Sequence, residues 1–272
     1  MPELPDVERY RRLLETGGMH RKIAKVSVIN ARILDSVAPK KFETALTGAA
    51  LLETRRRGKH LLVRHDRGGW ITMHFGMSGD LVLAATGEEP PPYTRIRFDF
   101  EGGGLLAYVS RRMLGRVGLT DDAEAFCRDR DLGIDALDPS LDRRTFIALV
   151  AGSRRGAKAA LMDQGVIAGI GNIYSDEILF QTRLHPKARL EALDEVTLGR
   201  LYDAMRRVLE VAIERGAGSE EFLDRLPRGY LLPHRKKTGK CPRCGAPLAT
   251  LKLGSRTSWF CPHCQPASRR EN

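Results

Sequence analysis

Four cysteines near the end of the chain form two C-x-x-C pairs that are separated by 16 residues. Four thiolates at this spacing suit a tetrahedral zinc site, with each pair on a tight turn and a short hairpin between the pairs. Two disulfides are the alternative, but a cytosolic chain disfavours them. The pattern predicts a zinc ribbon with one structural Zn²⁺ over residues 233–266, followed by a tail over 267–272. The predicted ligands are Cys241, Cys244, Cys261 and Cys264.

The charge balance points to a polyanionic partner. Of 272 residues, 45 are Lys or Arg and 34 are Asp or Glu, which gives a formal net charge of +11. Residues 235–272 alone hold nine Lys or Arg and one acid. Such an excess favours nucleic acid over a membrane surface. No apolar run approaches the ~20 residues of a membrane span, and the acidic start is unlike a secretory signal. We therefore expect a cytoplasmic, nucleoid-associated protein with no membrane partner.

The chain opens Met1-Pro2-Glu3-Leu4-Pro5. Removal of the methionine is easy before a small residue, and it would leave a secondary amine beside a carboxyl group. A terminal amine titrates near ~8, so part of it is neutral at pH 7. Such an amine can attack an aldehyde-like carbon and form an iminium, while Glu3 moves protons. The alternative is that Pro2 is only a processing signal.

The sequence pattern changes near residue 140 from one typical of strands to one typical of helices. Short apolar runs separated by glycine-rich turns fill the first part and are typical of a β-sandwich or barrel. A segment rich in aspartate over 128–142 reads as a linker, and helical spacing follows it. The predicted domains are 1–127, 143–232 and the zinc ribbon. The predicted strands are 23–30, 50–54, 60–65, 70–75, 80–84, 95–100 and 105–109. The predicted helices are 6–15, 157–162, 173–182 and one through 198–213 that ends at Gly216.

A glycine-rich turn joins two of the predicted helices over residues 163–174. With Asn172 as the N-cap of the second helix, exposed N–H groups and the helix dipole would form an anion site. Glycines there would let a phosphodiester approach the main chain, and Lys158 could add charge. The alternative is a compact corner between packed helices.

Several motifs occur together in one order along nearly the whole chain. They are Met1-Pro2-Glu3-Leu4-Pro5, Arg57-Gly58-Lys59-His60-Leu61, His74-Phe75-Gly76-Met77-Ser78-Gly79, Gly169-Ile170-Gly171-Asn172-Ile173-Tyr174 and the four cysteines. This set resembles formamidopyrimidine-DNA glycosylase, of the helix–two-turn–helix DNA repair family. The resemblance implies an α+β multidomain fold: an N-terminal helix plus β-sandwich, a central helix–two-turn–helix domain and the zinc ribbon.

The same resemblance implies an activity and a partner. The expected protein is a monomeric, bifunctional DNA glycosylase and abasic-site lyase of base excision repair. It would remove oxidised purines, namely formamidopyrimidine and 8-oxoguanine, from damaged double-stranded DNA and nick the strand by β,δ-elimination. Pro2 is then the nucleophile on sugar C1′ and Glu3 the proton donor. Lys59 assists β-elimination near the lesion phosphate, and Arg256 on the ribbon serves δ-elimination.

Further residues are expected to contact DNA. The resemblance places Asn172 and Lys158 at backbone phosphates that flank the lesion. Met77 is a plausible wedge into the gap left by the flipped base, with a role as core filler as the alternative. We also expect contacts from Tyr93 and Arg154.

One stretch departs from the family pattern. The family usually has Asp-Pro-Arg-Arg-Phe-Gly, whose arginine reads the opposite cytosine and whose phenylalanine wedges into the duplex, whereas this chain has Ser-Arg-Arg-Met-Leu-Gly over 110–115. If the two stretches are aligned on the glycine, Arg112 takes the place of the arginine that reads the opposite base, and Leu114 takes the place of the wedge. If they are aligned on the arginine pair, these places fall to Arg111 and Met113. We prefer the glycine anchor because it needs no gap. The aromatic wedge is absent in either case.

The region that corresponds to the family's lesion-covering loop, residues 218–232, looks short. A short lid would weaken discrimination of 8-oxoguanine and leave ring-opened purines or abasic sites as better substrates. Two alternatives stand beside the main hypothesis. An oxidised-pyrimidine glycosylase resembling endonuclease VIII is disfavoured by Leu4-Pro5, and a non-catalytic damaged-DNA-binding protein is disfavoured by intact Pro2, Glu3 and Lys59.

Overall fold

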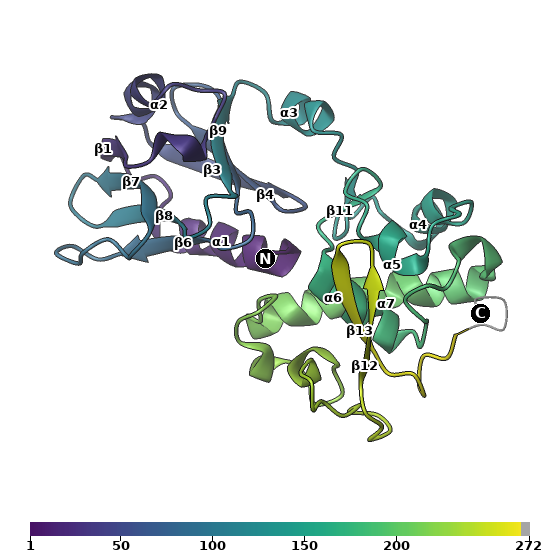
Figure 1. Ribbon diagram of the computed structural model, residues 1–272. Helices are drawn as coiled ribbons and strands as arrows, with labels where there is room; N and C mark the ends of the chain where they lie inside the picture. Colours follow the sequence, from purple (N-terminus) through teal and green to yellow (C-terminus); the bar gives the residue numbers. More distant parts are fainter. Residues whose placement is uncertain (268–272) are drawn as a thin grey trace. The chain divides into compact units, whose positions relative to one another are not determined.

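The structure is a computed structural model that describes residues 1–267 (Figure 1). It divides into two compact units. The first contains Met1–Pro2 and Asp6–Asp131, and the second contains Glu3–Pro5 and the chain from Leu132 onward. The unit boundary falls inside the stretch that we expected to be a linker. No helix within residues 1–267 is long and apolar enough to cross a membrane.

Two β-sheets make up most of the first unit (Figure 1). Their strands are β1 (Ile23–Val28), β2 (Leu34–Asp35), β3 (Leu51–Arg57), β4 (His60–His65), β5 (Trp70–His74), β6 (Gly79–Ala84), β7 (Thr94–Phe100), β8 (Leu105–Ser110) and β9 (Arg116–Thr120). One sheet has the order β2–β9–β5–β4–β3 and the other β1–β7–β8–β6. All the strands expected from the sequence are present, with ends that differ by a few residues.

One apolar core joins the two sheets and two helices, α1 (Leu4–Gly17) and α2 (Pro39–Leu46). Strand β7 shows the alternation that places every second side chain in this core: Ile96, Phe98 and Phe100 are buried, and the residues between them are not. Both sheets contribute, so the expected β-sandwich is confirmed. Helix α2, strands β2 and β9, and the later helices α3 (Ala123–Asp129) and α4 (Arg143–Val150) were not predicted.

The second unit is helical and carries the hairpin of the zinc ribbon. Its main elements are α4 (Arg143–Val150), α5 (Ala157–Leu161), α6 (Asn172–Gln181), α7 (Glu195–Arg215) and the hairpin β12 (Ala249–Leu253) and β13 (Arg256–Phe260). Short 3₁₀ turns are η2 (Leu190–Ala192), η3 (Leu223–Arg225) and η4 (Leu232–His234). Helix α7 starts at the cap Asp194 and ends at Gly216 in the left-handed region, as expected. Helix α6 is buried from Ile173 to Phe180, which makes it the centre of this unit.

The stretch 128–142 holds regular structure. Helix α3 (Ala123–Asp129) runs into it, and β10 (Ile134–Asp135) pairs in parallel with β11 (Ile167–Ala168) of the glycine-rich turn. Its last residue, Asp142, caps α4 by accepting a hydrogen bond from the Thr145 N–H. The many aspartates therefore serve turns and a helix cap rather than an unstructured connection.

Candidate active site

The carboxylate of Glu3 is completely buried at the start of α6, within the second unit. It accepts hydrogen bonds from the N–H groups of Gly171 at 2.8 Å, Ile173 at 2.8 Å and Tyr174 at 3.1 Å. The first N–H groups of a helix have no partner within the helix, and the helix dipole favours negative charge there. Glu3 accepts hydrogen bonds from these N–H groups and places a carboxylate at the helix start, although it lies 168 to 171 positions away in the chain.

The glycines of the turn make room for the start of the chain. A Cβ atom on Gly171 would lie 2.4 Å from the Glu3 carboxyl carbon, and one on Gly169 would lie 2.5 Å from a methyl carbon of Leu4. The Leu4 N–H also donates to the Gly169 carbonyl at 3.1 Å. We expected a phosphodiester to lie close to the backbone at these glycines, but Glu3 and Leu4 lie there instead. Larger residues at 169 or 171 would exclude both side chains.

The expectation that Asn172 caps α6 is wrong. The cap residue is Gly171, without a side-chain hydrogen bond, and Asn172 is the first helical residue. The carboxylate of Glu3 takes the N–H groups that an asparagine cap would have served. Among residues 1–267, the buried Oδ1 atom of Asn172 has no hydrogen-bond partner.

Lys158 lies inside the second unit, only 1% exposed. Its ammonium donates to the Asn172 carbonyl at 3.1 Å and forms a short ion pair with Asp176. Burial lowers the pKa of Lys158, and the facing Asp176 carboxylate opposes that shift. Lys158 therefore stabilises the start of α6 from inside the unit. Arg154, in contrast, is exposed in the loop between α4 and α5.

In the first unit, Lys59 lies at the tip of the β3–β4 hairpin. Arg57 pairs with His60, so Gly58 and Lys59 form a two-residue turn. Gly58 has φ +56°, and glycine at the first central position suits a type II′ turn. The turn holds the lysine at a defined point between paired strands.

Two loops of the first unit present apolar side chains to solvent. Met77 is 42% exposed and Leu114 is 49% exposed. Their backbones lie against each other, because a Cβ atom on Gly76 would come within 2.4 Å of the Leu114 carbonyl carbon. The Arg112 N–H also donates to the Ser78 hydroxyl at 2.9 Å. Met113 packs against the apolar core instead, so Leu114 is the one of the two that is presented to solvent.

Nearby groups fix the shape of these two loops. The Tyr108 hydroxyl donates to the His74 carbonyl at 2.7 Å and leaves no space for a side chain at Gly115. Nδ1 of His74 accepts from the Gly76 N–H at 3.3 Å, and burial lowers the pKa of His74 to about 4. The imidazole is therefore neutral at pH 7, as an acceptor must be. Tyr93 is also exposed, with the Arg111 guanidinium 5.7 Å from its ring centre.

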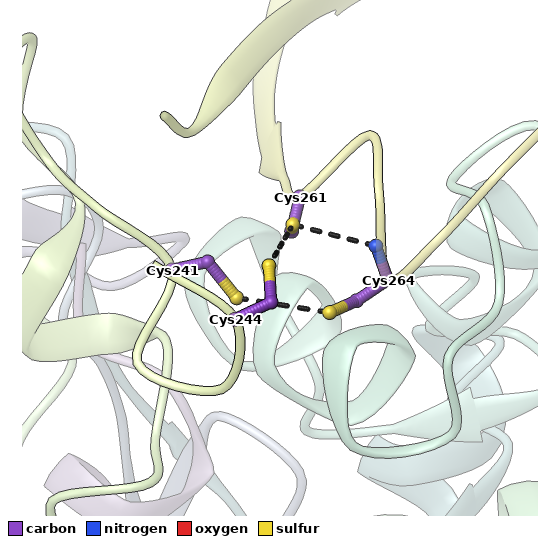
Figure 2. A group of neighbouring side chains, drawn as sticks. All are labelled: Cys241, Cys244, Cys261 and Cys264. Carbon is purple, nitrogen blue, oxygen red and sulfur yellow. Dashed lines mark hydrogen bonds between the residues drawn. The ribbon is translucent and has the colours of Figure 1, made fainter. Parts of the chain in front are cut away.

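Figure 2 shows the four ribbon cysteines with their sulfurs gathered together. All four Sγ atoms lie within 4.8 Å of one another. Cys241 and Cys264 are 3.8 Å apart and Cys244 and Cys261 are 3.5 Å apart. Tetrahedral thiolates at about 2.3 Å from zinc would be about 3.8 Å apart, so the cluster fits one structural zinc ion.

The ribbon packs on the end of α6. Cys241 and Cys261 share an apolar cluster with Phe180 and Leu231. The side chain of Arg256, at the start of β13, is exposed, with one guanidinium nitrogen 3.8 Å from the Met162 sulfur. Arg256 is therefore free to meet solvent-borne anions at the edge of the hairpin.

Sequence reasoning missed two buried acids, Asp176 and Glu177, in the middle of α6. The Glu177 carboxylate accepts from the Leu232 N–H at 2.9 Å and from the Gln181 amide at 2.6 Å. Two acids within a helix that has no other charged residue were the available signal, because buried carboxylates need partners.

Replacement of Glu177 by glutamine should change how stability depends on pH. Burial raises the pKa of Glu177 from 4.5 to about 7. Because the folded state binds this proton more tightly, wild-type stability is lost as pH rises from the unfolded pKa to about 7. In that window the variant should gain up to ~3 kcal/mol in unfolding free energy relative to wild type.

Urea unfolding at pH 4.5, 6 and 8 measures this difference. Glu210→Gln, at an exposed position on α7, is the matched control and should run parallel to wild type. If the unfolding free energy of Glu177→Gln also changes with pH in parallel with that of wild type, the raised pKa of Glu177 is contradicted.

Comparison with known proteins agrees with this organisation. Family models match residues 1–117 (formamidopyrimidine-DNA glycosylase N-terminal domain), 132–224 (formamidopyrimidine-DNA glycosylase H2TH domain) and 239–267 (zinc finger found in FPG and IleRS). The formamidopyrimidine-DNA glycosylase of Moorella thermoacetica is 38% identical over 93% of this chain and 95% of its own length.

Solved structures give the same result. Lactococcus lactis Fpg bound to DNA containing N7-benzyl-Fapy-dG has a TM-score of 0.88 and 29% identity, and it covers 98% of this chain and 100% of its own. The same enzyme with DNA containing an abasic site has a TM-score of 0.87 and 28% identity, over 97% and 100% of the two chains. The chain therefore belongs to the formamidopyrimidine-DNA glycosylase family and is a DNA glycosylase of DNA repair with one structural zinc ion.

Proposed function

We propose that the protein removes oxidised purines from double-stranded DNA and cleaves the resulting abasic site through an imine on Pro2. The observation that supports this most is the burial of Glu3 at the start of α6, directly after Pro2 in the chain. A carboxyl group held by three backbone N–H groups has a fixed position, and fixed acids and bases are what proton transfer requires.

The first step joins the terminal amine to the sugar. After removal of Met1, the Pro2 nitrogen attacks C1′, and the base leaves with the electron pair of its bond and takes up a proton. The Pro2 nitrogen then gives up its own proton to the Glu3 carboxylate, which passes it to O4′ as the C1′–O4′ bond breaks and the iminium forms. Extrusion of the nucleotide from the stack must come first.

The second stage cleaves the strand. The iminium acidifies the C2′ proton, whose loss expels the 3′ phosphate by β-elimination. Loss of a C4′ proton then expels the 5′ phosphate by δ-elimination, and hydrolysis of the imine regenerates Pro2. Lys59 and Arg256 are proposed at the phosphates that leave in the two eliminations, where cations stabilise developing negative charge.

DNA contacts are proposed for Asn172, Arg154 and Tyr93. Lys158 serves as a positioning residue, because its ammonium holds the Asn172 carbonyl from inside the unit. The basic ribbon adds affinity through phosphates, which would be salt-dependent. We also propose that the protein acts as a monomer in the cytoplasm, associated with the nucleoid.

Met77 and Leu114 are proposed to fill the gap left by the extruded nucleotide, and Arg112 to read the opposite base. The exposure of both apolar side chains on loops fixed by Gly76 and Gly115 supports this assignment. The segment 218–232, which carries η3, is proposed as a short lid. Ring-opened purines and abasic sites would then be better substrates than 8-oxoguanine.

Borohydride trapping tests the imine. Processed protein is incubated with duplexes that carry 8-oxoguanine, formamidopyrimidine, thymine glycol or an abasic site, and a covalent adduct should form with at least one. Pro2→Gly should give none, because it loses the ring that fixes the direction of the amine. Protein that retains a residue ahead of Pro2 should also give none. If no duplex yields an adduct with wild type, the proposed activity is wrong, and a thymine glycol preference would favour the oxidised-pyrimidine alternative.

Loss of one zinc ligand tests the role of the ribbon. Cys244→Ser should release zinc and lower duplex affinity at fixed salt ~10-fold or more, about 1.4 kcal/mol. Metal analysis and fluorescence anisotropy measure the two effects. Cys127→Ser, at a buried cysteine outside the zinc cluster, should keep both zinc and affinity. Unchanged affinity after zinc loss would mean that the ribbon does not serve DNA binding.

Truncation of the proposed wedge should separate base excision from strand cleavage. Leu114→Ala should slow base excision from duplex DNA ~10-fold, about 1.4 kcal/mol of barrier, and slow cleavage of a preformed abasic site less. Leu114→Phe should retain excision. Ile29→Ala, at an apolar position 57% exposed, is the control and should match wild type in single-turnover assays. Equal excision rates for Leu114→Ala and wild type would mean that Leu114 does not act as the wedge.

A further inference from the structure

Asp176 is a buried carboxylate that joins three separate parts of the second unit. It lies on α6, four residues after Asn172, and is completely buried. Its Oδ1 atom accepts from Lys158 of α5 and from the Ser258 hydroxyl, the latter at 2.6 Å. Its Oδ2 atom accepts from the Trp259 N–H at 3.0 Å and pairs with Arg235 at 3.1 Å.

Two of these partners belong to β13, the strand that begins with Arg256. Hairpin β12–β13 is a sheet of its own, and no other strand within residues 1–267 pairs with it to fix its orientation. Side chains two apart on a strand project to the same face. Arg256 and Ser258 therefore share a face, and Ser258 holds that face against α6 through Asp176. The contact of Arg256 with Met162, at the end of α5, lies on the same side.

Charged groups of both signs surround this contact. Lys158 and Arg235 pair with Asp176, and Glu3 also acts electrostatically on Lys158. Lys158 in turn donates to the Asn172 carbonyl at 3.1 Å. A continuous chain of polar contacts thus runs from the first residue of α6 to the strand that carries Arg256.

We propose that Asp176 is a positioning residue for the second strand-cleavage step, and that it sets the place of Arg256 relative to the start of α6. The inference rests on the proposed function, in which Asn172 and Arg256 both meet phosphates of the DNA backbone. Imine formation uses Pro2 and Glu3 and does not require β13. Loosening of the Asp176–β13 contact should therefore reduce δ-elimination selectively.

Ser258→Ala is the main test, because it removes one hydrogen bond to Asp176 and leaves the buried charges paired. A preformed abasic-site duplex is cut under single-turnover conditions, and the β and δ products are resolved on a gel. We expect the ratio of δ to β product to fall at least fivefold, with borohydride trapping within twofold of wild type. Ser258→Thr keeps the hydroxyl and should restore the ratio. Thr250→Ala, at an exposed position of the same hairpin, is the control and should keep the wild-type ratio.

Asp176→Asn is the second variant, because its single acceptor oxygen can keep the hydrogen bond from Ser258 or from the Trp259 N–H but not both. It also leaves Lys158 and Arg235 without a negative partner. It should show the same fall in ratio, and zinc content and thermal unfolding are measured for every protein. If Asp176→Asn does not fold, Ser258→Ala decides alone. An unchanged ratio in folded, zinc-loaded Ser258→Ala overturns the inference, as does a parallel loss of trapping and δ product. Absence of trapping or δ product in wild type would instead refute the proposed function itself.

Discussion

The carboxylate of Glu3 at the start of α6 is the interaction on which the rest of the site depends. It fills the place of an N-cap side chain, so α6 needs none of its own, and Gly171 can stand in the cap position. It also explains the glycines at 169 and 171, which leave space for Leu4 and Glu3. A group that caps a buried helix cannot be exchanged without cost to the fold. Under the proposed mechanism, activity lost on replacement of Glu3 would therefore mix a structural and a chemical effect.

Around that interaction the second unit balances its buried charges. Glu3 and Asp176 are buried acids, and Lys158 and Arg235 are the cations that face Asp176. Burial of Glu3, Asp176 or Lys158 alone would be costly, so these three residues and the partly exposed Arg235 form an interdependent set. Glu177 differs, since its partners are N–H groups of neutral residues and its pKa is raised to about 7. A buried carboxylate on or near α6 is thus stabilised where a cation or the helix dipole faces it, and its charged form is destabilised where neither does.

Local patterns predicted most of the strands and the main helices, and long-range contacts explain the errors at Asn172 and Lys158. The missed helices α2, α3 and α4 differ, because they carry local start signals: a proline in the first turn of α2 and the caps Asp122 and Asp142. Alternating apolar residues and glycine turns were enough for the strands, and Gly216 marked the end of α7. Asn172 was the best cap by local rules, but Glu3 displaced it from 168 to 171 positions away, a separation that no window of sequence reveals. Lys158 looked like a surface cation, since its partner Asp176 is 18 residues further along. The cysteine cluster could be predicted because metal ligation fixes the spacing directly.

The departure from the family pattern at 110–115 has a structural logic of its own. Gly115 is required because the Tyr108 hydroxyl and the His74 carbonyl occupy the space of any side chain there. Met113 has φ +55° and packs inward, so it cannot replace the missing aromatic residue without unpacking the core. Position 114 is then the one apolar position between Arg112 and Gly115 that faces solvent. A leucine has less area than a phenylalanine to stack on a base, but in the proposed wedge role it can still fill volume. Under the proposed wedge role, discrimination of the opposite strand would therefore change at position 114 without any change at Pro2 or Glu3, where the proposed chemistry takes place.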